Sequence, residues 1–204
     1  VDALNARKSP IIDNELSKYL AEKDLNLSAS SDLRSSVKGA DYVIVSTPTN
    51  YDEQTNFFDT SSVEAVIAQV VETEPEACIV VKSTIPPGTT ANLNSDVSNI
   101  QVVFNPEFLT EANHIEDFKN QTRIILGGPR PATTVVKTLF KRAFPSVPII
   151  KTGSNTAEMV KYFINCFLAT KVTFANEMYF ISQELDIDFD KVTEYALYDQ
   201  RIGR

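Results

Sequence analysis

Residues 154–184 read SNTAEMVKYFINCFLATKVTFANEMYFISQE and contain neither glycine nor proline. Apolar side chains recur around most of the circumference of a helix, so the stretch predicts one helix far longer than the average of about 11–12 residues. Asn155 and Glu158 have the spacing of a capping box in its first turn. Because apolar residues face several directions, we expect this helix to be buried on several sides.

Two polar residues interrupt this apolar surface. Lys161 and Asn165 lie one helical turn apart, so their side chains share a face and can reach a common point. A buried ammonium group is costly unless it is paired. A lysine in an anonymous helix more often extends its ammonium group to solvent. Both interpretations stand until the other motifs are considered.

The composition is that of an ordinary globular protein, with 43% hydrophobic and 23% charged residues among 204. The length allows one large domain, or one domain with part of a second. A formal charge of -8 argues against nucleic acid or an anionic membrane as a partner. No apolar run approaches the ~18 residues of a membrane span. Cys78 and Cys166 fall in apolar segments, which indicates two buried free thiols in a reduced, cytoplasmic protein.

The sequence before the long helix predicts strands that alternate with helices. The expected strands are 41–46, 77–82, 101–105, 123–126 and 147–151, with a further candidate at 25–30. Before the long helix, the expected helices are 13–23, 33–38, 60–72, one that ends at 97, 115–118 and 131–144, and a further helix at 189–197 follows it. Asp13 and Asp188 are the expected N-caps of the first and the last of these helices. This order predicts an α/β, Rossmann-like parallel sheet. We expect residues 1–152 to form that domain and residues 153–204 to open a helical domain.

Ligands of such sheets bind outside the carboxyl ends of the strands. This rule selects four polar segments, namely 47–50, 83–84, 105–111 and the start of the long helix. A dinucleotide site would also need a G-x-G-x-x-G turn, and the six glycines do not form one. Either the sheet binds no dinucleotide or its first βα unit precedes Val1. The chain begins like the tail of a helix, so we expect it to be an internal part of a longer protein.

Four motifs occur together in a characteristic order: Thr47–Tyr51, Lys82–Pro86, Asn105–Glu111 and Lys161–Asn165. With this order and spacing, the chain resembles the UDP-glucose/GDP-mannose dehydrogenase family, and most of all its UDP-glucose 6-dehydrogenases. The resemblance extends along essentially the whole chain, as far as the segment 199–203. The Lys-x-x-x-Asn motif alone also occurs in 3-hydroxyacid dehydrogenases, so it does not choose the substrate.

The resemblance implies a two-step oxidation of UDP-glucose to UDP-glucuronate, with two NAD molecules reduced and a thioester on a cysteine. It makes Lys161 and Asn165 the groups that hold the reacting sugar oxygen, where an ammonium and an amide donor stabilise a developing oxyanion. Glu107, with Thr84, is expected to position or activate the hydrolytic water. Without the resemblance, Glu107 would be read as an acid that begins a helix after Pro106.

The same resemblance supplies further expected contacts. The residues expected at the sugar are Glu107, Phe108, Leu109, Lys161 and Asn165, and Arg201 is expected to reach the sugar site of a partner subunit. The residues expected at NAD are Thr49, Thr84 and Glu111. Taken singly, Thr49 and Thr84 could be plain loop formers, and Arg201 a solvated charge. We expect a homodimer joined through the long helix, and no metal site.

Several features depart from the family pattern. The segment with the nucleophilic cysteine would lie beyond Arg204, and Cys166 does not match it. Thr110 stands where many members have arginine, which bears on sugar specificity. His114, the single histidine, is read as a surface residue without a catalytic role. We therefore expect this chain alone to be inactive.

Three alternatives remain open at this stage. Within enzymes, the chain could belong to a dehydrogenase for UDP-N-acetylmannosamine or GDP-mannose, although the segment 47–59 favours UDP-glucose by resemblance. Outside enzymes, it could be a non-catalytic Rossmann-like module that dimerises or binds nucleotide. In a purely structural protein, Lys161 and Asn165 would simply meet solvent.

Overall fold

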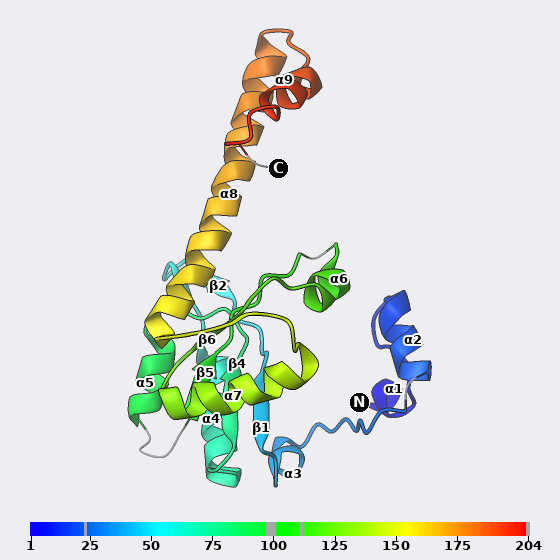
Figure 1. Cartoon of the computed structure of the whole chain (residues 1–204), viewed down its shortest axis with the longest axis vertical. Coiled ribbons are helices and arrows are strands. Elements are labelled where there is room, and N and C mark those ends of the chain that lie inside the picture. The colour runs from blue at the N-terminus through cyan, green and yellow to red at the C-terminus, as the bar shows by residue number, and fades with distance from the viewer. Residues whose placement is uncertain (23, 97–100, 111, 203–204) are drawn as a thin grey trace.

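The computed structural model describes residues 1–22, 24–96, 101–110 and 112–202. Its centre is a five-stranded sheet in the order β1-β4-β5-β6-β7 (Figure 1). The strands are β1 (Tyr42–Val45), β4 (Cys78–Val81), β5 (Gln101–Phe104), β6 (Ile124–Gly127) and β7 (Ile149–Thr152). The predicted α/β, Rossmann-like architecture is confirmed.

Helices cover both faces of this sheet. They are α3 (Leu33–Val37), α4 (Ser61–Thr73), α5 (Thr89–Asp96), α7 (Arg130–Ala143) and α8 (Ser154–Glu184). Alternate strand residues point to opposite faces, as the period of a strand requires. Ile79, Val81 and Phe104 pack in one buried cluster with α4 and α8, whereas Val80 and Val103 pack in another with α7.

The expectation of an entirely parallel sheet is wrong at one position. β1, β4 and β5 are parallel to one another, and so are β6 and β7, but β6 pairs antiparallel with β5 through Phe104 and Gly127. A parallel neighbour needs a crossover that packs over the sheet. In its described part, the connection from β5 to β6 contains one short helix, α6 (His114–Lys119), which stands apart from the sheet (Figure 1).

Other local expectations need correction. β1 is an edge strand, so Ile44 is 53% exposed instead of buried. Residues 25–30, all of them described, form an extended connection without a strand. A small hairpin, β2 (Tyr51–Asp52) with β3 (Phe57–Phe58), was not expected, and the ring of Phe58 packs edge-on against Tyr162 of α8. The end expected at Val97 lies outside the described residues.

The N-terminal segment forms an arm of two helices, α1 (Asp2–Asn5) and α2 (Asn14–Glu22), joined to the sheet by the extended connection (Figure 1). The expected cap Asp13 accepts a hydrogen bond from the main-chain nitrogen of Leu16 at 2.8 Å. The arm contacts α6 through His114, whose Nε2 lies 3.2 Å from Oδ2 of Asp13, and through an ion pair of Lys119 with Glu15.

The bounds of α8 are those expected, but its surroundings are not. Its first turns pack on the sheet, while its later turns extend past it with α9 (Phe189–Ala196) alongside (Figure 1). Met159, Phe163, Phe167 and Phe174 are each more than half exposed. The expectation of burial on several sides is therefore wrong within this chain, because one small sheet covers only the first turns. Cys166 is likewise exposed, whereas Cys78 is buried as expected.

The close approach of α8 to the sheet depends on Gly127. A Cβ atom at this position would lie 2.5 Å from the Cβ of Ala157 and 3.0 Å from the Cα of Ser154. Only a residue without a side chain lets the first turn of α8 sit against the end of β6. This contact sets where the polar residues of α8 lie above the sheet.

Candidate active site

The candidate site begins with Lys82, the residue after β4. Its ammonium nitrogen donates a hydrogen bond to Oδ1 of Asn105 at 3.2 Å and lies 3.9 Å from Oε2 of Glu107. Asn105 is 4% exposed and donates its Nδ2 to the carbonyl oxygen of Ile125 at 2.9 Å. Lys82 is therefore held by a side chain that is itself fixed to two neighbouring strands.

Lys161 reaches the same place from α8. Its ammonium group donates a hydrogen bond to the main-chain carbonyl oxygen of Glu107 and lies 5.6 Å from the ring centroid of Phe108. The guanidinium of Arg123 lies 4.7 Å from the same centroid. Cations near an aromatic ring are attracted by its electron-rich face. The segment after β5 is thus held by positive groups from α8 and from the residue before β6.

Burial and nearby charges shift the pKa of both lysines. Burial lowers the pKa of Lys82, the Glu107 carboxylate partly offsets this, and the Lys161 ammonium lowers it further. Burial also lowers the pKa of Lys161, again partly offset by Glu107. Two cations around one carboxylate leave an excess of positive charge, which suits a ligand oxygen that becomes negative during a reaction.

A cavity of about 360 Å³ opens beside this cluster. Its lining includes Lys82, Glu107, Phe108, Leu109 and Arg123. The side chain of Glu107 is 44% exposed, so its carboxylate is open to a ligand from this side. The cavity therefore places the Glu107 carboxylate, the cations of Lys82 and Arg123 and the ring of Phe108 around one space.

The loops after β1 and β4 meet next to this cluster. The Thr49 hydroxyl donates to the carbonyl oxygen of Thr84 at 2.7 Å, and the Ser83 hydroxyl donates to the carbonyl oxygen of Thr47 at 2.6 Å. The two threonines expected at the cofactor are therefore adjacent, at the edge where parallel strands bind ligands.

Glu158 has a role that the sequence did not indicate. The N-cap of α8 is Gly153, without a side-chain cap, so the expected capping box of Asn155 with Glu158 is wrong. Glu158 is fully buried and accepts hydrogen bonds from the main-chain nitrogens of Gly88 at 2.7 Å and Thr90 at 2.8 Å. It ties α8 to the loop that carries Thr84, because the start of α5 presents free N–H groups to an anion.

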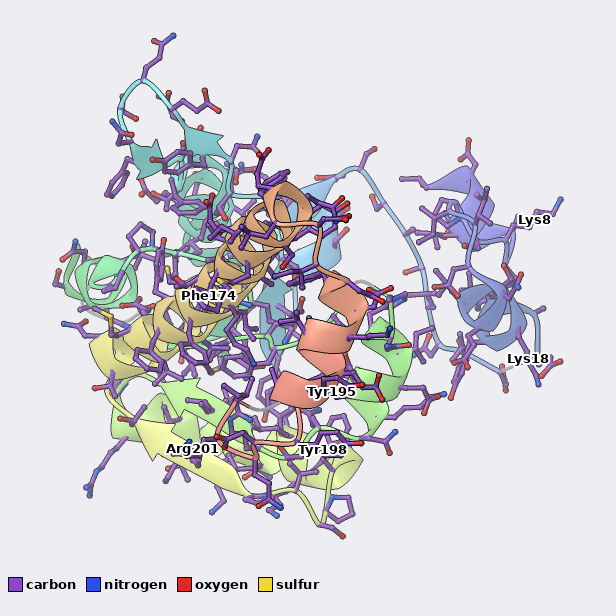
Figure 2. All side chains as sticks on the ribbon, turned by 90° about the horizontal axis from the view of Figure 1, so that it is seen from above. Lys8, Lys18, Phe174, Tyr195, Tyr198 and Arg201 are labelled. Carbon is purple, nitrogen blue, oxygen red and sulfur yellow. The ribbon has the colours of Figure 1, made fainter. Side chains whose placement is uncertain are left out.

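Some expected site residues lie outside this cluster. Asn165 follows Lys161 by one turn of α8 and is exposed. Arg201 lies in the segment that follows α9 (Figure 2) and pairs with Asp199, with Nε 3.0 Å from Oδ1. Glu111 lies outside the described residues. Within one chain, the structure thus joins Glu107, Phe108 and Lys161, but not Arg201.

The sequence motifs include Lys82 and Asn105 but do not indicate a role for either residue. Their position could have indicated a site, since each residue directly follows the carboxyl end of a buried apolar strand. His114 pairs with Asp13 between α6 and the N-terminal arm, away from the cluster around Lys161. Thr110 donates both its main-chain nitrogen and its hydroxyl to Asp117.

The fold and the site are those of a Rossmann-like α/β protein with a charged site at its strand ends. Residues 1–144 match the family model for the NAD binding domain of the UDP-glucose/GDP-mannose dehydrogenase family, and residues 155–204 match its central domain. The chain belongs to the UDP-glucose/GDP-mannose dehydrogenase family.

Relatives and solved structures agree with this family. The chain is 38% identical to UDP-glucose 6-dehydrogenase of Streptococcus pneumoniae and 32% identical to that of Campylobacter jejuni, over 100% of this chain and 54% and 52% of theirs. The chain thus spans about half the length of the curated relatives it matches.

Two solved structures share its fold along nearly all of the chain. A UDP-glucose dehydrogenase from Pyrobaculum islandicum gives a TM-score of 0.88 at 30% identity, covering 100% of this chain and 50% of that one. A GDP-mannose dehydrogenase from Pseudomonas aeruginosa gives 0.85 at 27%, covering 98% and 49%. In the part of the chain that the structure describes, no helix has the length and apolar character to span a membrane.

Proposed function

We propose that this chain is part of an NAD-dependent dehydrogenase that oxidises UDP-glucose to UDP-glucuronate in two NAD-linked steps. The observation that carries the proposal is the meeting of Lys161 and Glu107 at the carboxyl edge of the sheet, where such folds bind ligands. The identity of 38% to a UDP-glucose 6-dehydrogenase over the whole chain supports UDP-glucose as the substrate.

Lys161 and Asn165 are proposed to hold the sugar oxygen that reacts, since both can donate hydrogen bonds to one point from a single helix face. The ammonium group would stabilise negative charge that develops on that oxygen. Glu107, with Thr84, would orient or deprotonate the water that releases the acid product. Phe108 and Leu109 line the cavity beside Glu107 and would bound the sugar ring.

The residues present fit the nicotinamide end of NAD better than its pyrophosphate. Thr49 and Thr84, joined by a hydrogen bond at the ends of β1 and β4, and Glu111 would contact the cofactor. The six glycines form no G-x-G-x-x-G turn that would seat the pyrophosphate. When bound, NAD supplies the acceptor for the hydride, and the residues named above orient the sugar toward it.

The two thiols of this sequence do not fit the role of the thioester nucleophile. Cys78 is 5% exposed and packs in the cluster with α7, and burial raises its pKa to about 11. Cys166 lies beside Asn165, in a motif where the family has no such nucleophile. We therefore expect that these 204 residues alone do not form UDP-glucuronate.

We further propose a domain division at 152/153, with a NAD-binding part first and a central part that begins with α8. The exposed apolar residues of α8 favour a homodimer built on that helix, in which Arg201 would reach the sugar site of the partner. Free thiols at both cysteines support a cytoplasmic location.

Binding of three nucleotide sugars to the chain tests the substrate. We expect titration calorimetry to give tighter binding for UDP-glucose than for UDP-N-acetylmannosamine or GDP-mannose. A preference for GDP-mannose would contradict UDP-glucose as the substrate and would favour the activity in the name of the Pseudomonas aeruginosa structure, GDP-mannose dehydrogenase. Absence of binding for all three sugars would contradict a nucleotide-sugar site on this chain.

A further inference from the structure

Lys82 occupies a position that the proposed roles do not use. It is the first residue after β4, and its side chain is only 18% exposed. Lysine is seldom buried to this extent unless it is paired. The groups that pair with its ammonium, Asn105 and Glu107, therefore indicate the role of Lys82 in the site.

Its partners divide into a fixed one and an adjustable one. Asn105 is fixed, since its main-chain nitrogen donates to the carbonyl oxygen of Val81 at 2.9 Å while its side chain donates to Ile125. Glu107 is adjustable, because its carboxylate is 44% exposed and lies 3.9 Å from the ammonium of Lys82. At that distance the attraction is electrostatic, without a directed hydrogen bond.

The main chain and the side chain of Glu107 are held by different lysines. Lys161 donates to its carbonyl oxygen, while Lys82 attracts its carboxylate. If Lys82 were neutral, Lys161 would be the stronger remaining attraction for that carboxylate. An ammonium group that pairs with Glu107 would be less free to bind the oxygen of a ligand.

We propose that Lys82 is a positioning residue of this site: anchored by Asn105, it holds the Glu107 carboxylate and so keeps the Lys161 ammonium available to the substrate. The role of Lys161 in binding the substrate rests on the proposed function. The arrangement of Lys82, Glu107 and Lys161 does not depend on it.

The titration of Lys161 provides a test that needs no enzyme activity. The charged groups around Lys161 are Glu107 after β5, Lys82 after β4, Arg123 across the ring of Phe108, and Glu158 on its own helix. Replacing Lys82 by methionine removes a like charge and frees the Glu107 carboxylate for Lys161. Both effects raise the pKa of Lys161.

The experiment is an NMR titration of the lysine side-chain Cε–Nζ signals in the whole chain, with Lys161→Met to assign the signal. We expect Lys82→Met and Lys82→Gln to raise the pKa of Lys161, and Lys82→Arg to leave it near the wild-type value. The matched control is Lys18→Met, on the exposed face of α2 in the N-terminal arm (Figure 2). A Lys161 titration that is the same in Lys82→Met and Lys18→Met would overturn the proposal.

A second measurement separates this inference from the proposed function. In calorimetry with UDP-glucose, Lys82→Met should weaken binding by about tenfold, Lys82→Arg should restore most of it, and Lys18→Met should have no effect. A wild-type chain that binds no nucleotide sugar while Lys161 still responds to Lys82→Met would overturn the function and keep the arrangement. Wild-type binding that Lys82→Met leaves unchanged would overturn the positioning role.

If Lys82→Met and Lys82→Gln do not fold, the Lys82–Glu107 pair can be tested by substituting Glu107 instead. In Glu107→Gln, the titration of Lys82 is then the decisive measurement. Loss of the carboxylate should then lower the pKa of Lys82. An unchanged Lys82 titration in Glu107→Gln would show that the two side chains are not coupled, and the proposal would fall.

Discussion

Single residues at this site act through the balance of two ammonium groups and one carboxylate. Lys82 and Lys161 come from separate elements and meet at Glu107. Burial disfavours both charges, and the carboxylate between them compensates in part. The consequence is a pair of lysines that lose their protons more readily than exposed lysines do.

This balance predicts how ligand affinity depends on pH. Affinity that needs the Lys161 ammonium is present below its pKa and is lost as the pH rises through it. Because that pKa lies below the usual 10.5, the loss begins at a lower pH than for an exposed lysine. Glu107→Gln removes the charge that raises the pKa, so the loss should move to a still lower pH.

Calorimetric titrations with UDP-glucose over a series of alkaline pH values measure this effect. Glu177→Gln, the same substitution at an exposed position of α8, is the control and should keep the wild-type midpoint. An upward shift of the midpoint in Glu107→Gln would show that the carboxylate does not support these lysines.

At the scale of elements, the placement of α8 against the sheet decides whether Lys161 reaches Glu107. Gly127 permits the approach of the first turn, and Glu158 bonds that turn to the start of α5. Ala157 and Glu158, the α8 residues of these contacts, are fully buried and lie one turn before Lys161. The site is therefore built by the packing of one helix on the ends of several strands.

Gly127→Ala tests this packing. The added Cβ would overlap the side chain of Ala157, so we expect a loss of about 1–3 kcal/mol in the free energy of unfolding, as for other overpacked positions. Urea unfolding measures it. Gly153→Ala is the control for steric overlap, because a Cβ there would meet no atom within 4 Å and its cost is limited to the weaker N-cap that alanine gives α8. Equal stability of the two variants would mean that α8 does not approach the sheet so closely.

The sequence predicted elements better than their contacts. The bounds of α8, the strand positions and the caps at Asp13 and Asp188 follow from local periodicity and capping chemistry, which the sequence carries directly. The antiparallel pairing of β6 with β5 depends on where α6 packs, and the local sequence pattern does not specify that position. The hydrogen bonds of Glu158 join residues about 70 positions apart in the sequence, which a local motif cannot predict. The spacing of Asn155 and Glu158 therefore predicted a capping box, whereas Glu158 binds the start of α5 instead.

For the candidate site, the sequence motifs predicted which segments lie together, but not every contact between them. The carboxyl-end rule selected the segments that contain Glu107, Thr84 and Thr49, and the family resemblance selected these residues within them. The structure places all three at one edge of the sheet. Lys82 was missed because a lysine after a strand is common, and only its distance to Glu107 gives it a role. The sequence did not predict that Cys166 and Phe163 are exposed. An apolar composition favours burial of a helix face, but it does not specify whether the same chain or another one covers that face.

At the scale of the whole molecule, the chain has a packed half and an open half. The sheet and its helices bury their apolar residues, whereas α8 extends beyond the sheet (Figure 1). Its exposed apolar stripe includes Phe163 and Phe167, whose rings stack with their centroids 6.4 Å apart. Exposed apolar stripes of this kind mark interfaces. The proposed homodimer would cover this one.

Phe163→Glu combined with Phe167→Glu should therefore abolish self-association. We expect the wild-type chain to sediment as a dimer and the double variant as a monomer, because a charge in a buried apolar interface is costly. Ile12→Glu, at an exposed apolar residue of the N-terminal arm, should remain dimeric. A wild-type chain that sediments as a well-behaved monomer would contradict assembly through α8.

The most direct measurement for the account as a whole is the affinity of the chain for UDP-glucose when Lys161 is replaced by alanine. A charge-assisted hydrogen bond contributes about 1.5–3 kcal/mol, and 1.4 kcal/mol corresponds to a factor of ten. We therefore predict a loss of about tenfold to a hundredfold for Lys161→Ala. Lys171→Ala, about 15 Å further along the same helix, should bind like the wild type. Equal affinities of Lys161→Ala and the wild type would contradict a sugar site built on this lysine.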